Sequence, residues 1–183
     1  QNDSDLGALQ ITTFHSFCAR VLRSEANYLG LSRNFTVYDT SESKAIVKSL
    51  LSRRGISTKE LSPYEILYFI DEVKNAGYFT GVKEDHAIDL DDPLFSYYEE
   101  YESELHKANA VDFGGLITAV LELFEKFPEV LQRYQERFSY LLIDEYQDTN
   151  RAQFTLMRQL ASVNKNICVV GDDDQSIYSW RGA

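Results

Sequence analysis

Two short apolar runs, each followed at once by acidic residues, constrain the fold of this chain most. The run at 141–143 leads into Asp144 and Glu145, and the run at 167–170 leads into a glycine and three acids at 172–174. Such runs, bounded by turn residues, are typical of buried strands in a parallel sheet. A helix-length segment separates them, which predicts a β-α-β unit with both acidic clusters at one sheet edge. Because open α/β sheets bind ligands beyond the carboxyl ends of their strands, we expect a ligand crevice there.

The first acidic pair suits a site that holds a metal and a phosphate. Mg²⁺ prefers oxygen ligands and usually takes one or two carboxylates together with substrate phosphates, so Asp144 is the candidate ligand, directly or through a water. Glu145 would then orient or deprotonate an attacking water. The alternative is that these acids only end a strand, with Asp148 or Thr149 capping the helix that follows.

Three motifs carry a resemblance to a known family. The sequence Asp-Glu-Tyr-Gln-Asp-Thr-Asn at 144–150 resembles the Walker B motif of the UvrD/Rep/PcrA helicases of superfamily 1. The segment 171–183 resembles motif III of that family, and Thr-Phe-His-Ser-Phe at 13–17 resembles its early DNA-contacting motif. The motifs occur in the family's order. The resemblance implies an α/β P-loop NTPase fold, in which part of a RecA-like parallel sheet carries an inserted, mostly helical subdomain.

The resemblance also implies an activity. Members of this family are ATP-dependent DNA helicases that move 3′ to 5′ on single-stranded DNA and unwind duplexes during repair, recombination or replication. Expected ligands are therefore ATP, Mg²⁺, single-stranded DNA and single-strand/duplex junctions; no protein partner is indicated. Asp144 (Mg²⁺), Glu145 and Gln175 (at the γ-phosphate) match catalytic positions of the family. Gln147 and Arg181 match nucleotide-binding positions of the family. Gln147 matches a polar position near the catalytic glutamate, and Arg181 pairs with either an acid of the nucleotide site or a phosphate.

Four residues match DNA-contacting positions of the family. Thr13 and His15 lie where a helix begins, and free backbone amides at such a helix start can bind a phosphate. Without the resemblance, Thr12 or Thr13 would simply cap a core helix. Tyr178 and Trp180 match positions that stack on bases, a contact worth about 1–3 kcal/mol per base that reads no sequence.

The chain divides into three parts by its resemblance to the family. Residues 1–35 resemble part of motor subdomain 1A, residues 36–110 the inserted subdomain 1B, and residues 111–183 the remainder of subdomain 1A with Walker B and motif III. Helix signals fill the insertion: a capping box at Asp39, and a Ser-Pro start at 62–63. Where the family commonly has acids after a phenylalanine, this chain has glycines at 114–115.

Composition bounds these expectations. The net charge of −11 argues against nucleic-acid binding by bulk attraction, although a narrow track of stacking aromatics and backbone amides is compatible with it. No apolar run approaches the roughly 20 residues that cross a bilayer. We interpret Cys18 and Cys168 as reduced core residues of an intracellular protein. Together with the resemblance to the helicase family, this implies a cytoplasmic, bacterial protein.

Parts of the family's machinery have no counterpart in this sequence. No Gly-x-x-x-x-Gly-Lys-Ser/Thr phosphate loop occurs, and the chain does not begin with Met, so we expect a fragment of the first motor domain that alone neither hydrolyses ATP nor unwinds DNA.

Two other functional interpretations of the sequence stay open. One is a non-catalytic DNA- or protein-binding module with a vestigial nucleotide site. The other is a metal-dependent hydrolase, although the histidines at 15, 86 and 106 are scattered.

Overall fold

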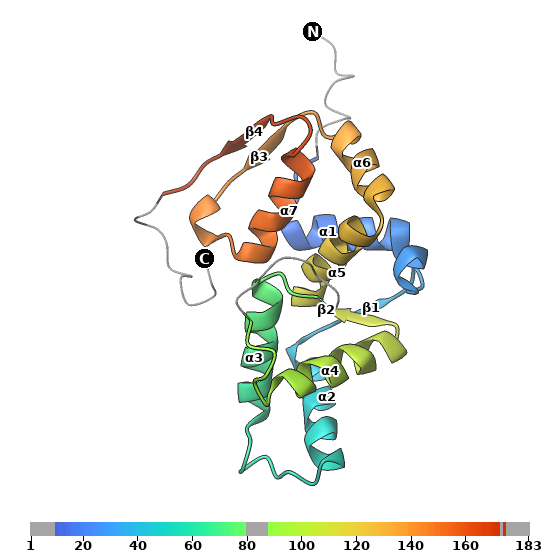
Figure 1. Cartoon of the computed structure of the whole chain (residues 1–183), viewed down its shortest axis with the longest axis vertical. Helices are drawn as coiled ribbons and strands as arrows, with labels where there is room; N and C mark the ends of the chain where they lie inside the picture. The colour runs from blue at the N-terminus through green and yellow to red at the C-terminus, as the bar shows by residue number, and fades with distance from the viewer. Residues whose placement is uncertain (1–9, 80–87, 173, 175–183) are drawn as a thin grey trace.

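The computed structural model describes residues 10–79, 88–172 and 174, which form two parts drawn one above the other in Figure 1. We call the region where the two parts meet the waist. In chain order the elements are α1 (Phe14–Glu25), η2 (Ala26–Leu29), β1 (Thr36–Tyr38), α2 (Thr40–Arg53), α3 (Pro63–Asn75), α4 (Phe95–Lys107), β2 (Ala110–Asp112), α5 (Phe113–Lys126), α6 (Pro128–Arg137), β3 (Leu141–Ile143), η3 (Tyr146–Asp148), α7 (Arg151–Ala161) and β4 (Ile167–Val169). Helices α1, α5, α6 and α7 with β3 and β4 make one part, and α2, α3 and α4 make the other.

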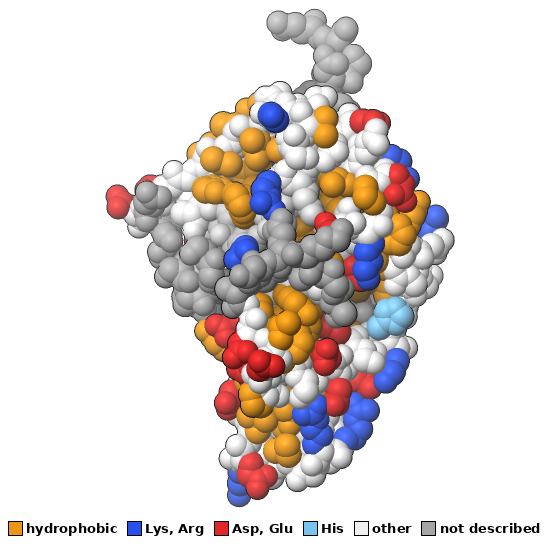
Figure 2. All heavy atoms as spheres, viewed as in Figure 1, with side chains coloured by type: hydrophobic (Ala, Val, Ile, Leu, Met, Phe, Trp, Pro, Cys, Tyr) orange, Lys and Arg blue, Asp and Glu red, His pale blue; other side chains and the backbone are white. Residues whose placement is uncertain are grey.

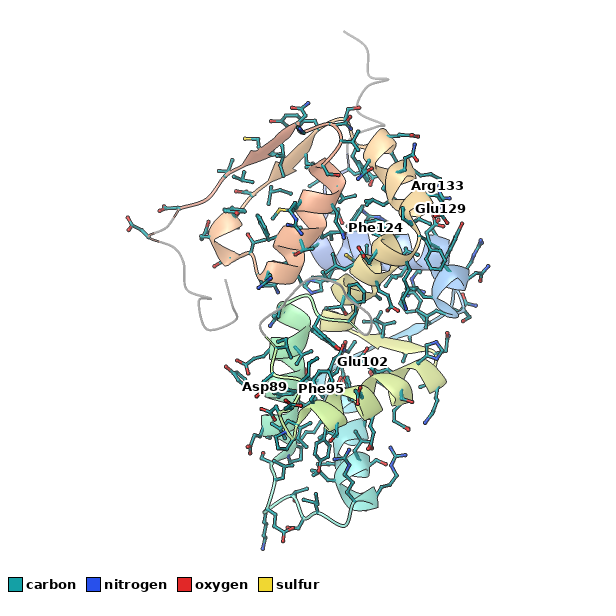
Figure 3. All side chains as sticks on the ribbon, in the orientation of Figure 1. Asp89, Phe95, Glu102, Phe124, Glu129 and Arg133 are labelled. Atoms are coloured by element: carbon teal, nitrogen blue, oxygen red, sulfur yellow. The ribbon has the colours of Figure 1, made fainter. Side chains whose placement is uncertain are left out.

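Each part has its own hydrophobic core. One core comprises buried residues of α1, α5, α6 and α7, with Phe124 1% exposed near its middle. The other draws on α2, α3 and α4, and includes Phe95 and the fully buried Tyr101. Figure 3 shows Phe124 in the first part, and Phe95 and Glu102, both of α4, in the second. The aromatic side chains of α4 at 95, 97, 98 and 101 are buried, so they pack in the helical bundle and do not form an exposed stacking platform.

Local capping explains where most helices begin. The Asp39 side chain accepts hydrogen bonds from two backbone amides of α2, and the Glu42 side chain accepts one from the Asp39 amide, so the predicted capping box is present. Ser62 caps α3, with Pro63 as its first residue. Thr13 is the residue that caps α1. The Asp-Pro pair at 92–93 is typical of a helix start, but α4 begins only at Phe95.

A parallel strand pair joins the two parts, and sequence reasoning missed it. Strands β1 and β2 pair in register, with Thr36 opposite Ala110 and Tyr38 opposite Asp112. They lie at the waist of the molecule (Figure 1). The run Thr-Val-Tyr at 36–38 has strand composition, but three residues carry too little periodicity to distinguish a strand from a loop. The chain thus enters and leaves the α2–α4 bundle through adjacent strands.

The predicted β-α-β unit is confirmed. Strands β3 and β4 pair in parallel, with Leu141 opposite Ile167 and Ile143 opposite Val169, and α7 connects them. The prediction that these strands are buried is wrong for this pair, because in the described residues it is a two-stranded sheet with open edges. Leu142 is 63% exposed, and Figure 2 shows hydrophobic side chains gathered over β3, β4 and α7.

Two segments differ from what their residue patterns indicate. Phe154 has the helical spacing of an inward residue of α7 but is 45% exposed, because the inward stripe of this helix runs through Ala152, Leu156 and Leu160. The segment Leu-Gln-Ile at 9–11 has the composition of a short strand end. Residue 9 lies outside the described residues, and Ile11 is in irregular structure and 89% exposed.

The two cysteines differ in burial. Cys18 is fully buried in the first core, as expected, and burial raises the pKa of its thiol to about 12. Cys168 lies on the half-exposed strand β4, and both cysteines are free. Across the described ranges, no helix combines the length and the apolar character that a membrane span requires.

Candidate functional site

The carboxyl ends of β3 and β4 bring the two acidic clusters together, as the sequence predicts. Backbone pairing continues beyond the strands, because the Val170 amide donates to the Ile143 carbonyl at 2.8 Å. The Tyr146 amide then donates to the Val170 carbonyl at 2.9 Å. Asp144 and Glu145 therefore leave one strand beside the turn at 171–172 that leaves the other. This edge is the place where an open α/β sheet binds its ligand.

The two acids at the end of β3 are exposed and held by local backbone geometry. The Glu145 amide donates to Asp144 Oδ1 at 3.0 Å, which fixes the direction of the Asp144 carboxylate. Glu145 itself has φ of 53° and ψ of 43°, the left-handed conformation. A residue other than glycine in this conformation costs about 1–2 kcal/mol, and such strain is typical of functional sites.

Gln147 connects the two clusters. Its Nε2 donates to Glu145 Oε2 at 2.6 Å, and its Oε1 accepts from the Asp172 amide at 3.0 Å. Gly171 allows this approach, because a Cβ at that position would lie 2.7 Å from Gln147 Oε1. The second acidic cluster is also ordered within itself, since the Asp174 amide donates to Asp172 Oδ1 at 3.1 Å.

The helix after the acids is capped by neither residue that the alternative reading named. Asn150 caps α7 through a capping box, in which it accepts from the Gln153 amide and the Gln153 side chain accepts from the Asn150 amide. The Asn150 Nδ2 also donates to Asn75 Oδ1 at 2.8 Å, which ties the start of α7 to the end of α3. The acids at 144–145 are therefore not used as helix caps.

The residues at this edge offer oxygen ligands of the kind that Mg²⁺ takes. Asp144 offers an exposed carboxylate whose orientation is fixed, which suits an ion that takes one or two carboxylates and completes its shell with phosphates and water. Within the part of the chain that is described, no three His, Cys, Asp or Glu side chains converge as a metal cluster. The arrangement fits a metal that arrives with a phosphate ligand.

Thr13 and His15 lie together at the start of α1. The Thr13 hydroxyl accepts from the Ser16 amide at 3.2 Å, so it serves as the helix cap. The His15 ring is half-buried and packs edge-on against Phe113 of α5, with ring centroids 5.6 Å apart. Burial lowers the pKa of His15 below its usual 6.5, so the ring is neutral at pH 7. A neutral ring can donate one hydrogen bond to a phosphate but brings no charge.

The remaining predicted site residues lie outside the described residues: Gln175, Tyr178, Trp180 and Arg181.

A buried ionic cluster at the waist was missed by sequence reasoning. The Lys74 side chain at the end of α3 is fully buried, and its Nζ lies 2.6 Å from both Asp112 Oδ1 and Glu102 Oε1. The Tyr101 hydroxyl donates to Asp112 Oδ2 at 2.8 Å, and the Gly115 amide donates to Asp112 Oδ1 at 2.7 Å. The sequence spacing indicated that Lys74 is buried, because it stands four residues after the buried Ile70 and therefore lies on the apolar face of its helix.

This cluster explains the glycines that depart from the family pattern. A Cβ at Gly114 would lie 3.0 Å from Lys74 Cδ, and one at Gly115 would lie 2.6 Å from Asp112 Oδ1. Burial alone would lower the pKa of Lys74, but the charges of Asp112 and Glu102 outweigh it and raise the pKa above 10.5. Burial alone would raise the pKa of Asp112, but Lys74 lowers it below 3.8.

The chain is similar to known DNA helicases. Residues 2–183 match the family described as the UvrD/REP helicase N-terminal domain. The chain is 43% identical over 174 residues to the ATP-dependent DNA helicase PcrA of Staphylococcus aureus, covering 94% of this chain and 24% of that protein. It is 43% identical over 176 residues to PcrA of Bacillus subtilis, and 42% identical over 174 residues to PcrA of Staphylococcus epidermidis, with the same coverage. The chain thus spans about a quarter of the length of these relatives.

Proposed function

Because the chain belongs to the UvrD/REP helicase family, we propose that it is part of an ATP-dependent DNA helicase. The observation that carries this proposal is the meeting of two acidic clusters at one edge of a parallel strand pair, bridged by Gln147. The whole protein would move 3′ to 5′ on single-stranded DNA and unwind duplexes in repair, recombination or replication. Its partners would be ATP, single-stranded DNA and single-strand/duplex junctions in the cytoplasm.

We assign the nucleotide chemistry to the edge formed by β3 and β4. Asp144 would hold Mg²⁺, which supplies charge to neutralise the phosphates when it is bound with ATP. Glu145 would orient and deprotonate the attacking water, and Gln175 would contact the γ-phosphate. Arg181 would pair with an acid of this site or with a phosphate. Support comes from the exposed, oriented carboxylate of Asp144 and the strained backbone that presents Glu145.

We assign the DNA contacts to two other places on the chain. Thr13 and His15 would contact the DNA backbone at the start of α1, where the helix presents free amides. Tyr178 and Trp180 would stack on bases. A backbone contact at α1 is compatible with the net charge of −11, because a neutral histidine and helix amides need no basic patch.

We also propose a subdomain assignment, which rests on the family's pattern. Residues 1–35 and 111–183 would belong to the RecA-like motor subdomain 1A, and residues 36–110 would form subdomain 1B. The two separate hydrophobic cores support this division, since one is built from α2, α3 and α4 and the other from α1, α5, α6 and α7. The adjacent strands β1 and β2 would be the crossing point between the two.

Strand displacement by the full-length protein tests the helicase proposal. Duplexes with a 3′ single-stranded tail should be unwound with ATP and Mg²⁺, and duplexes with a 5′ tail should not. The variant Glu145→Gln should bind the same substrates but leave both intact. If wild type binds DNA but neither hydrolyses ATP nor separates any duplex, the protein is a binding module with a vestigial nucleotide site.

A further inference from the structure

Gln147 makes two hydrogen bonds that require opposite chemistry at its two ends. One end meets the carboxylate of Glu145, which only accepts, and the other meets the backbone amide of Asp172, which only donates. A primary amide supplies a donor and an acceptor from one side chain, whereas a carboxylate, a lysine or a leucine satisfies at most one of them. The amide orientation is therefore fixed by its partners, with Nε2 toward Glu145 and Oε1 toward Asp172.

The surroundings of Gln147 are shaped for this bridge. The amide lies so close to this segment that a Cβ at Gly171 would be 2.7 Å from Oε1, so a side chain there would displace the amide from its present position. The main chain brings the same segments together, because the Tyr146 amide donates to the Val170 carbonyl at 2.9 Å. The bridge thus spans two segments that a main-chain ladder already holds side by side.

The hydrogen bond from Gln147 matters for the direction of the Glu145 side chain, because Glu145 lies outside regular helix or strand. Its side chain is exposed, and its backbone is left-handed, with φ of 53°. No helix or strand therefore fixes its direction, and an exposed glutamate samples several rotamers. The hydrogen bond from Gln147, at 2.6 Å and to a charged acceptor, is of the stronger kind.

We propose that Gln147 is a positioning residue: it holds the Glu145 carboxylate at its working position and makes that position depend on the turn at Gly171–Asp172. The inference rests on the proposed function, in which Glu145 orients the attacking water. The turn lies three residues before Gln175, the proposed γ-phosphate contact. A shift of that turn on nucleotide binding would pass through one side chain to the catalytic carboxylate.

Three variants of the full-length protein test the bridge by steady-state ATPase kinetics with single-stranded DNA. Gln147→Leu loses both hydrogen bonds, and kcat should fall by about 10- to 100-fold, since a carboxylate misplaced by about 1 Å loses a factor of that order. KM for ATP should change by less than about threefold, because the residue acts on Glu145 and not on the nucleotide. Gln132→Leu removes a comparable exposed amide, which donates to Glu136 at 2.8 Å on α6, and should leave both constants unchanged.

Gln147→Glu separates positioning from a general structural role. It keeps the acceptor for the Asp172 amide but faces Glu145 with a second carboxylate, and two carboxylates at that distance repel each other. Its kcat should therefore fall as it does in Gln147→Leu, although the segment 171–172 keeps its hydrogen bond to position 147. Hydrogen exchange of the peptide 170–174 gives a second readout. The Asp172 amide should exchange about fivefold faster in Gln147→Leu, and at the wild-type rate in Gln147→Glu.

The outcomes distinguish this inference from the proposed function. If wild type hydrolyses ATP and Glu145→Gln does not, the helicase proposal stands. In that case, a Gln147→Leu variant with the kcat of Gln132→Leu would overturn the inference alone. A rise in KM for ATP without a fall in kcat would also overturn it, because Gln147 would then be a nucleotide contact. If wild type hydrolyses no ATP with any nucleic acid, the proposed function fails and the positioning role of Gln147 fails with it.

Discussion

Replacing Lys74 by methionine should destabilise the chain far more than any surface lysine replacement. The Lys74 ammonium lies 2.6 Å from Asp112 Oδ1 and 2.6 Å from Glu102 Oε1, and its side chain is fully buried. Methionine keeps most of the aliphatic stem that packs against Gly114 but removes the charge. Asp112, of which only 10% of the side chain is exposed, then keeps its carboxylate without the cation that compensates it.

The expected loss follows from the contacts that remain. Removing one partner of a buried ion pair typically costs about 3–5 kcal/mol of the free energy of unfolding. Asp112 retains hydrogen bonds from the Tyr101 hydroxyl and the Gly115 amide, and Glu102 is partly exposed, so the lower end, about 3 kcal/mol, applies. The double variant Lys74→Met/Asp112→Asn should recover at least about 1 kcal/mol, because no buried charge is left at position 112.

Urea unfolding at pH 7, followed by circular dichroism, measures this difference. The control is Lys126→Met, which breaks an exposed pair with Glu122 on α5 and should cost less than about 0.5 kcal/mol. If Lys74→Met and Lys126→Met shift the urea midpoint equally, the cluster at the waist does not stabilise the fold and the reasoning is wrong.

The difference should also depend on pH in a defined direction. Asp112 has a pKa below its usual 3.8 in the folded state, so its contribution is complete above that value and is lost as the pH falls through the lowered pKa. Lys74 has a pKa above 10.5, so its contribution is complete below that value and is lost as the pH rises through the raised pKa. Wild type and Lys74→Met should therefore converge in acid, below about pH 4, and diverge most between pH 5 and 10.

Three smaller predictions concern caps, thiols and a histidine. Asn150→Ala removes both the cap of α7 and the hydrogen bond to Asn75, and should lower the free energy of unfolding by about 1–2 kcal/mol; no loss in urea unfolding would contradict this capping role. At pH 8, iodoacetamide should label Cys168 and spare the buried Cys18, whose pKa is about 12; mass spectrometry showing equal labelling would contradict that burial. The His15 imidazole should titrate below pH 6.5 by NMR, because burial disfavours its charged form. The free energy of unfolding should fall as the pH is lowered through this pKa, and a midpoint above 6.5 would contradict the half-buried position of the ring.

The sequence predicted what is encoded by neighbouring residues. The capping box of Asp39 and the Ser-Pro start at 62–63 are signals confined to four residues, and both are present. The strands at 141–143 and 167–170 were recognised because an apolar run and a helix-length spacer are visible in one stretch of chain, and their parallel pairing is confirmed.

What the sequence did not predict depends on residues far apart along the chain. Strands β1 and β2 pair although about 70 residues separate them, and three-residue strands have no periodicity of their own. Lys74 was passed over because a lysine on a helix is normally solvated, and its partner Asp112 stands 38 residues away. The exposure of Phe154 also depends on distant residues, since the elements packed around α7 decide which face of this helix is buried.

For Asp144, Glu145 and Gln147, the sequence indicated a site and the structure adds its geometry. Their pattern pointed to a nucleotide site through resemblance, and their closeness to the turn at 171–172 is now seen in the structure. Their catalytic roles stay predictions.

ATP hydrolysis by the full-length protein, with and without single-stranded DNA, tests the central proposal most directly. Wild type should be stimulated by the DNA, Glu145→Gln should show no hydrolysis, and Trp180→Ala should hydrolyse ATP without being stimulated. That result would support the nucleotide site at the ends of β3 and β4 and the stacking role of Trp180 together. If wild type shows no hydrolysis with any nucleic acid, the motor is vestigial and the α2–α4 bundle becomes the place to look for a binding function.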